Sequence, residues 1–233
     1  MIKKINTKTM KLIKFYDLIN HNLIYNNKAI NRYRKENFEI SEDKVKSLEL
    51  LKRTILNLKN CDLKKQAKNI VFSDGNPKSK IMLVGEAPGA NEDQEGLPFV
   101  GRAGQLLDKM LSAIDLNRKK VYISNIINYR PPENRKPSEK ETKRYLPFIK
   151  RHIEIINPKI LVLLGSTAMN ALIGNEVVIS KMRGKWIEKQ FGNCKTSVII
   201  TFHPAFLMRQ PGQKKMAWID LKMIRDKKIK LKI

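Results

Sequence analysis

The sequence predicts an α/β fold: a three-layer sandwich with a central four-stranded parallel sheet and helices on both faces. Four short runs rich in branched apolar residues, at 81–84, 121–124, 160–164 and 198–201, indicate the strands. Each run is apolar throughout, which is typical of parallel strands that helices cover on both faces. Helical patterns separate the runs, as expected when strands and helices alternate along the chain.

The part of the chain before these strands is predicted to be helical. Residues 1–60 lack strand signals and carry apolar residues at helical spacing, among them Leu48, Leu51, Ile55 and Leu58. With 233 residues the chain is long enough for one good core and too short for two full domains. We therefore expect a helical N-terminal extension at 1–60 and a single domain at 61–233.

Helix signals fill the intervals between the strands. Apolar residues at 106, 107, 110, 111 and 114 predict a helix after the first strand. Ser138 and Glu141 form a capping box just after Pro137 and predict a helix that runs to about Ile156. A further helix follows the third strand and is expected to end at Gly174.

Polar residues stand at the ends of the predicted strands. Glu86, Asn125, Ser166 and His203 come at or just after the four ends. The loop after the first strand, residues 85–104, holds four acids and five of the chain's 11 glycines. Because ligands of open parallel sheets bind at the carboxyl ends of the strands, these residues predict a pocket there. The acidic, glycine-rich loop would form one of its walls.

Charge and cysteine content limit the partners and the location. A net charge of +25 favours a polyanionic partner such as nucleic acid, although a compositional bias toward Lys, Ile and Asn is an alternative explanation. Cys61 and Cys194 suggest no disulfide framework. The N-terminus lacks signal-peptide features, and the longest apolar run, 160–164, is too short to span a bilayer. These features predict a soluble cytoplasmic protein without a membrane partner.

Three blocks of sequence resemble one known family. They are "VGEAPGANEDQEGLPFVGRAGQLLDKML" (84–111), "YISNIINYRPPENRKP" (122–137) and "TFHPAFLMRQPGQKKMAWIDL" (201–221), and they resemble the type 4 family of uracil-DNA glycosylases. The resemblance runs from about residue 61 to about residue 224. It implies an enzyme of base-excision repair that flips uracil out of DNA and hydrolyses its N-glycosidic bond, which leaves an abasic site. Residues 61–233 would be its catalytic domain.

The resemblance implies a set of uracil-binding residues. Phe99 would stack on the flipped base, although an aromatic residue in a loop is more often a core plug. Asn125, a residue type common in turns, carries an amide that complements N3–H and O4 of uracil but mismatches cytosine. His203 and the backbone of Glu86 and Ala87 complete the set.

Three residues are candidates for the bond-breaking step. His203 would donate to O2 of the departing uracil, as an oxyanion-hole group does. Glycosidic cleavage builds an oxocarbenium-like sugar, which a carboxylate can stabilise while it orients water. Glu92 is the first choice for positioning that water, with Glu86 closer to the uracil ring. The resemblance does not decide between the two carboxylates.

Basic and apolar residues of the surrounding loops are candidates for DNA contacts. A basic residue at a helix start or in a stiff loop suits a phosphate. Apolar residues after the fourth strand are candidate wedges that hold the base out of the stack, with core packing as an equal alternative for each. The predicted DNA-binding residues are Arg102, Arg130, Arg135, Arg183, Lys185, Leu207, Met208 and Arg209.

The chain departs from the family at the iron–sulfur ligands. Type 4 members typically bind a four-iron four-sulfur cluster through four cysteines, and only Cys61 stands at such a position here. Lys64, Tyr129 and Tyr145 replace the other three. A single thiolate cannot hold a cluster that requires about four. We therefore predict that the cluster is absent, that no other metal or cofactor is used, and that the two tyrosines fill the volume.

Two other classes of function are alternatives to an enzyme that acts on DNA. One is a uracil-DNA binding protein without turnover, which would need a histidine-bearing loop that 179–188 lacks. The other is a nucleotide-binding oxidoreductase, whose G-x-G-x-x-G pattern fits "GEAPGA" poorly. We expect the partner to be uracil-containing DNA, single- or double-stranded, and the protein to be a monomer.

Overall fold

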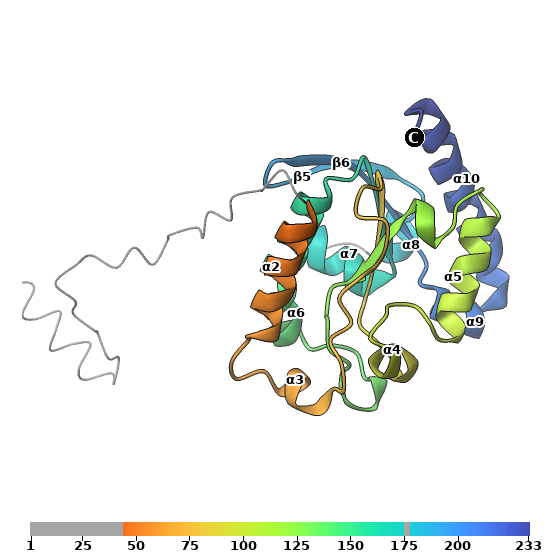
Figure 1. Cartoon of the computed structure of the whole chain (residues 1–233). Coiled ribbons are helices and arrows are strands. Elements are labelled where there is room, and N and C mark those ends of the chain that lie inside the picture. Colours follow the sequence, from red (N-terminus) through yellow and green to blue (C-terminus); the bar gives the residue numbers. More distant parts are fainter. Residues whose placement is uncertain (1–43, 175–177) are drawn as a thin grey trace, which may run out of the picture. The chain divides into compact units, whose positions relative to one another are not determined.

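The computed structural model describes residues 44–174 and 178–233, which form a mixed α/β unit around a six-stranded sheet (Figure 1). The strands are β1 (Asp74–Gly75), β2 (Ile81–Gly85), β3 (Tyr122–Asn125), β4 (Ile160–Leu164), β5 (Trp186–Phe191) and β6 (Cys194–Thr201). The helices are α2 (Lys44–Leu56), α3 (Asp62–Gln66), α4 (Ala90–Glu95), α5 (Arg102–Ser112), α6 (Glu139–Ile156), α7 (Ser166–Leu172), α8 (Ile179–Met182), α9 (Pro204–Arg209) and α10 (Lys214–Lys230).

The strand order is β1-β3-β2-β4-β6-β5, and the four inner strands β3, β2, β4 and β6 run parallel to one another. The register places Gly85 of β2 opposite Asn125 of β3, and Leu164 of β4 opposite Thr201 of β6. The carboxyl ends of these strands are therefore level, and the loops that follow them start from one edge of the sheet.

An antiparallel strand at each edge makes the sheet wider than the four strands that the sequence predicts. β1 pairs with β3 through two residues, and β5 forms a hairpin with β6. All but the last residue of β5 are exposed or half-exposed, so the strand lacks the apolar run that marks a buried strand. The Gly192-Asn193 pair between β5 and β6 is a hairpin signal that indicates this strand.

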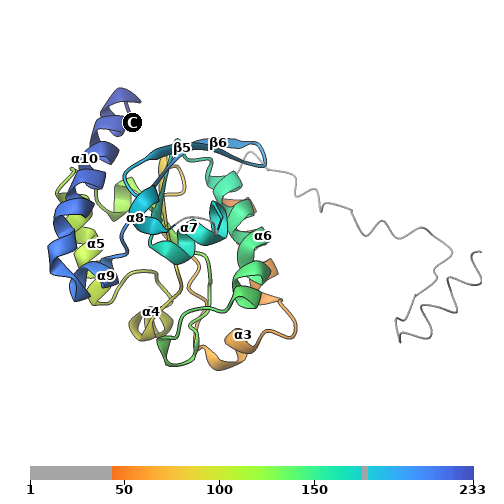
Figure 2. The same cartoon turned by 180° about the vertical axis from the view of Figure 1, so that it is seen from behind.

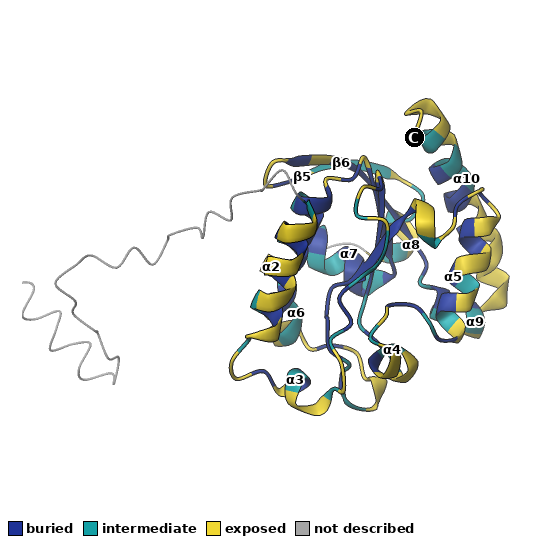
Figure 3. Ribbon diagram, in the orientation of Figure 1, coloured by how far each residue is buried: buried dark blue, intermediate teal, exposed yellow. Residues whose placement is uncertain are grey.

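Helices cover both faces of the sheet. α2, α6 and α7 pack on one face, and α5, α9 and α10 pack on the other (Figures 1 and 2). Successive side chains of a strand point to opposite faces, so Met82 and Val84 join the first apolar layer whereas Ile81 and Leu83 join the second. Figure 3 shows these strands buried beneath helices whose outer surfaces are exposed. Burial on both faces explains why the strands are apolar throughout.

The helix signals in the sequence are confirmed where the structure describes them. α6 begins with the capping box, in which Ser138 Oγ accepts from Glu141 N at 3.2 Å and the Glu141 carboxylate accepts from Ser138 N at 2.7 Å. α2, within the range expected to be a helical extension, buries Leu48, Leu51 and Ile55 in the same layer as α6. Residues 1–43 of that range lie outside the described residues. No described helix is long and apolar enough to cross a bilayer.

Candidate active site

A cavity of about 180 Å³ opens at the carboxyl edge of the sheet, beside the ends of β2 and β3 and the start of α9. Its lining includes these residues that the sequence analysis assigned to the site: Glu86, Ala87, Glu92, Phe99, Asn125, Arg135 and His203. They come from loops that follow three different strands. The level strand ends therefore bring together residues that are far apart in the sequence.

Asn125, which lines this cavity, carries a buried acceptor without a partner. The residue is 3% exposed, and its side-chain oxygen Oδ1 is buried without a hydrogen-bond partner. Such an atom is costly in a folded protein unless a ligand or water satisfies it. Gly85, opposite Asn125 in the sheet, leaves the space for it: a Cβ at Gly85 would collide with Oδ1 and would lie 2.5 Å from Cζ of Phe99. The amide and the ring are therefore packed around a position that only glycine can occupy.

Phe99 is held in place by its backbone. The residue is 5% exposed and has a left-handed conformation with φ 57°. Arg118 fixes this turn, because its guanidinium donates to the carbonyls of Pro98, at 3.0 Å, and Phe99. Asp74 and Asp108 anchor the same guanidinium at 2.6 and 2.8 Å. Sequence reasoning missed Arg118, and no local signal marks a partner so distant along the chain.

His203 is a neutral hydrogen-bond donor in this site. Its Nδ1 accepts from the backbone N–H of Ala205 at 3.2 Å, so in the neutral ring the proton lies on Nε2. Burial and the positive charge of Arg209 lower the pKa of His203 to about 4. The ring centroid lies 5.5 Å from that of Phe99, and both rings line the cavity. At neutral pH the imidazole therefore offers Nε2–H without carrying a charge.

The acids of the loop 85–104 have different partners. Glu92 accepts from Gly89 N at 3.1 Å with one carboxylate oxygen and from Gly101 N at 2.9 Å with the other. Asp93, 3% exposed, accepts from two backbone amides of the segment 68–69. These bonds hold the loop in shape. Both oxygens of Glu92, the first choice for positioning water, are thus engaged with the backbone.

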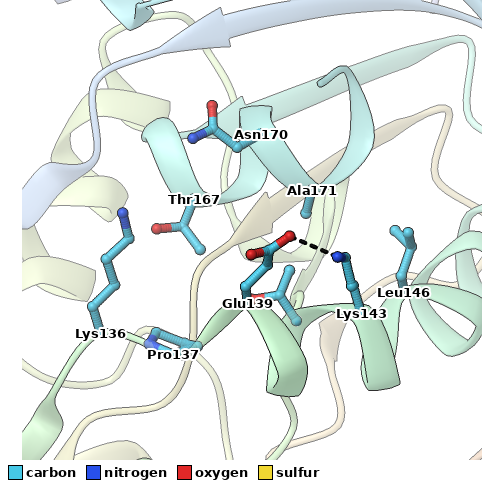
Figure 4. A pocket seen from close by; sticks show the side chains of 9 residues that line it. Lys136, Pro137, Glu139, Lys143, Leu146, Thr167, Asn170 and Ala171 are labelled. Carbon is cyan, nitrogen blue, oxygen red and sulfur yellow. Dashed lines mark ion pairs between the residues drawn. The ribbon is translucent and has the colours of Figure 1, made fainter. Parts of the chain in front are cut away.

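Glu86 is bound differently. Its Oε2 accepts from the hydroxyl of Thr167, and no described residue is bonded to its Oε1. Thr167 is 5% exposed and lies in the first turn of α7, next to a separate hollow of about 260 Å³ between α6 and α7 (Figure 4). One side chain therefore fixes the Glu86 carboxylate, and Glu86 is also among the residues that line the cavity. Sequence reasoning did not identify Thr167.

The predicted phosphate contacts fall into two groups. Arg102, Lys185 and Arg209 are exposed, and none of their charged groups is in an ion pair with a described side chain. Arg130 instead donates to Asn134 Oδ1 at 2.8 Å, and Arg135 is paired with Glu141 at 2.7 Å.

Arg183 was predicted to contact DNA, but the structure places its side chain in the protein interior. Its side chain is 8% exposed and is paired with Asp220, which is fully buried. The guanidinium also lies 5.4 Å above the ring of Phe202. A buried charge separated from its partner is strongly unfavourable, so Arg183 belongs to the packing beneath the candidate site and is not an exposed cation available to a phosphate.

Of the two candidate wedge residues, Leu207 and Met208, the structure buries the first. Leu207 is 1% exposed and packs in the apolar layer beneath α9, so it is a core residue. Met208 is half-exposed and remains a candidate. Phe206, which the sequence analysis did not single out, is half-exposed and lines a second cavity next to His203.

Comparison with known proteins places this site in a family. Residues 72–222 match the model of the uracil DNA glycosylase superfamily. The chain belongs to this superfamily. It is 41% identical to the type-4 uracil-DNA glycosylase of Sulfurisphaera tokodaii over 77% of this chain and 84% of the relative. The type-4 uracil-DNA glycosylase of Archaeoglobus fulgidus is 38% identical over 77% and 92%, and that of Thermotoga maritima is 40% identical over 70% and 83%.

The residues at the family's iron–sulfur positions do not fit a cluster. Tyr145 is fully buried with its hydroxyl 3.2 Å from Cys61 Sγ, and Tyr129 is 3% exposed. Burial and the neighbouring Cys61 raise the pKa of Tyr129 to about 12, which keeps the phenol protonated. Lys64 donates to the carbonyl of Leu56. One thiol, two phenols and an ammonium do not make a thiolate ligand set, and no other group of three potential metal ligands gathers within 44–174 and 178–233.

Proposed function

We propose that this chain excises uracil from DNA by hydrolysing its N-glycosidic bond. The observation that carries the proposal is the buried, partnerless Oδ1 of Asn125 beside the ring of Phe99, in a cavity at the carboxyl edge of the sheet. A flat base with an N–H donor at its edge would satisfy that oxygen and stack on that ring. Membership of the superfamily, and the name that the three relatives share, support the same activity.

Base choice is proposed to rest on the Asn125 amide. Oδ1 would accept from N3–H of uracil while Nδ2 donates to O4. Cytosine presents an acceptor at N3 and a donor at N4, so both contacts would fail and leave buried groups unpaired. The backbone of Glu86 and Ala87, which lines the same cavity, would contact the other edge of the base.

Bond cleavage is proposed to use His203 and Glu86. As the bond between C1′ and N1 breaks, its electron pair moves to the uracil ring, and negative charge develops at O2. Nε2–H of the neutral His203 would donate to that oxygen and stabilise the leaving anion. The second oxygen of Glu86 would stabilise the oxocarbenium-like sugar and orient the water whose oxygen bonds to C1′. The water gives up one proton as it bonds to C1′ and the uracil anion takes up one proton, so the products are free uracil and an abasic site.

The remaining features follow from this activity. Arg102, Lys185 and Arg209 are proposed to bind phosphates, with Met208 touching the bases next to the site. Residues 61–233 are proposed as the catalytic domain, with α2 packed on its surface and 1–60 as an extension. We further propose that the protein acts as a monomer in the cytoplasm, without an iron–sulfur cluster.

Single-uracil oligonucleotides test the function directly. Purified protein is incubated with single- and double-stranded DNA that holds one uracil, and abasic sites are cleaved with alkali. Excision of uracil but not of cytosine at the same position is expected. A protein that binds both substrates and cleaves neither would be a binding module, contrary to the proposal.

A further inference from the structure

A second cavity adjoins the candidate uracil pocket. It has a volume of about 630 Å³ and shares Glu86, Ala87, Asn134, His203 and Ala205 with the smaller cavity. Sites for small organic ligands have volumes of about 300–1,000 Å³, so the space beyond His203 is large enough for another nucleotide. Neither the uracil-binding set nor the bond-breaking residues account for it.

An aromatic pair forms one wall of this second cavity. The rings of Phe202 and Phe206 lie 4.9 Å apart at an angle of 38°. Phe202 is 8% exposed and is backed by the guanidinium of Arg183, which the buried Asp220 holds. Phe206 is the more exposed of the two and stands in α9, three residues after His203. The pair is therefore a supported aromatic surface and not a loose side chain.

Two cations line the same cavity. Arg209 and Lys136 are both exposed, and neither is in an ion pair with any residue of the described ranges. Arg209 follows Phe206 at helical i,i+3 spacing, so the two lie on one face of α9. A flat apolar ring with unpaired positive charges beside it suits a nucleotide, whose base stacks and whose phosphate is anionic.

We propose that the second cavity binds the nucleotide adjacent to the flipped uracil on the same strand. Its base stacks on Phe206, and its phosphate lies between Arg209 and Lys136. The inference rests on the proposed function, because it takes the smaller cavity as the uracil site. Since both contacts go to one strand, the enzyme binds unpaired DNA through this cavity without needing the complementary strand.

The test compares oligonucleotides that differ only beside the uracil. Each single strand carries 2′-fluoro-deoxyuridine, which resists cleavage, and the base on its 5′ or 3′ side is either present or replaced by a tetrahydrofuran spacer that keeps the phosphate. Binding is measured by fluorescence anisotropy at one fixed salt. Loss of the stacked base on one side is expected to weaken binding by wild-type protein about 10-fold.

Variants locate the effect. Phe206→Ala should bind the intact strand about 10-fold more weakly than wild type does, and its affinity for the spacer strand should be no lower than its affinity for the intact strand. Phe206→Trp should show the wild-type affinities. Trp218→Ala removes another exposed aromatic, on α10 and outside the cavity lining, and should show the wild-type pattern. When the binding assay is repeated over a series of salt concentrations, Arg209→Gln and Lys136→Gln should each reduce the slope of log affinity against log salt by about 0.7.

Three outcomes would overturn the inference. Wild-type binding could be insensitive to the spacer on both sides, Phe206→Ala could remain as sensitive to the spacer as wild type, or the salt slopes could stay unchanged in both charge variants. Because binding is the readout, these results are separate from excision. A protein that shows the stacking pattern but does not excise uracil from the cleavable strand contradicts the proposed function alone.

Discussion

Replacing Thr167 with Val should slow uracil excision while leaving DNA binding unchanged. The two side chains have nearly the same shape, but Val cannot donate to Oε2 of Glu86 as the Thr167 hydroxyl does. Thr167 is 5% exposed, so water cannot easily take the place of the hydroxyl. The Glu86 carboxylate would then be free to turn away from the position in which we propose that it orients water.

The size of the effect follows from the type of bond. A hydrogen bond to a charged group contributes about 1.5–3 kcal/mol, which corresponds to a loss of about 10- to 100-fold in rate. The loss should fall on kcat, because Thr167 lies outside the lining of both cavities at the candidate site. Single-turnover excision on one oligonucleotide at saturating enzyme measures this rate, and anisotropy measures binding.

Two control variants separate positioning from folding. Thr167→Ser keeps the hydroxyl and should retain most of the wild-type rate. Thr201→Val makes the same change at another buried threonine, whose hydroxyl donates to Asp220 at 2.7 Å, and should lower Tm without a comparable loss of kcat. A Thr167→Val rate equal to wild type, or a Thr167→Ser rate as low as that of Thr167→Val, would refute the assignment.

Three further predictions follow from the site and the core. Asn125→Asp replaces the donor to O4 with an acceptor, and single-turnover assays should show uracil excision reduced by about 10²-fold or more; excision at the wild-type rate would remove Asn125 from base recognition. Purified protein should be colourless, without visible iron–sulfur absorbance, and still active; a brown protein with roughly four irons per chain would contradict the absence of the cluster. His152 is 1% exposed, is stacked on Phe72 and lies 2.8 Å from the Tyr122 hydroxyl, and burial lowers its pKa to about 3. The pKa of His152 is near 6.5 in the unfolded chain and about 3 in the folded one, so at pH values between these two only the unfolded chain binds the proton. Lowering the pH from 7.5 to 5 should therefore reduce the free energy of unfolding by about 2 kcal/mol through His152. Urea unfolding at the two pH values should show that acidification destabilises His152→Leu by about 2 kcal/mol less than it destabilises wild type. An equal loss in the two proteins would show that His152 is not the group responsible.

The sequence by itself determined the parallel strands and the edge of the sheet at which the candidate site lies. Uniformly apolar runs at 81–84 and 160–164 predict strands buried on both faces, because no solvent-facing position interrupts them. Glu86, Asn125 and His203 were placed together from the sequence, because parallel strands bring their carboxyl ends to one edge. The capping box at Ser138 fixed the start of α6, since its bonds join residues only three apart.

The tertiary structure decided which polar groups are engaged by the protein itself. Glu86 and Glu92 lie in the same loop, yet one carboxylate is engaged by two backbone amides and the other is held by Thr167, 81 residues away. Arg183 was expected on the DNA surface and is instead bonded to Asp220, 37 residues away. Such partners are chosen by packing between distant elements, which no local spacing encodes.

The edge strand β5 and the apolar residues of α9 are two further cases in which local spacing does not decide burial. β5 is only partly buried, so its side chains carry little of the apolar pattern that marks a strand. Leu207 and Met208 are adjacent and equally apolar, but Leu207 is 1% exposed and Met208 is half-exposed, because neighbouring residues of α9 face different directions. Sequence records which residues are apolar, whereas the orientation of a short helix on the sheet selects which of them is buried.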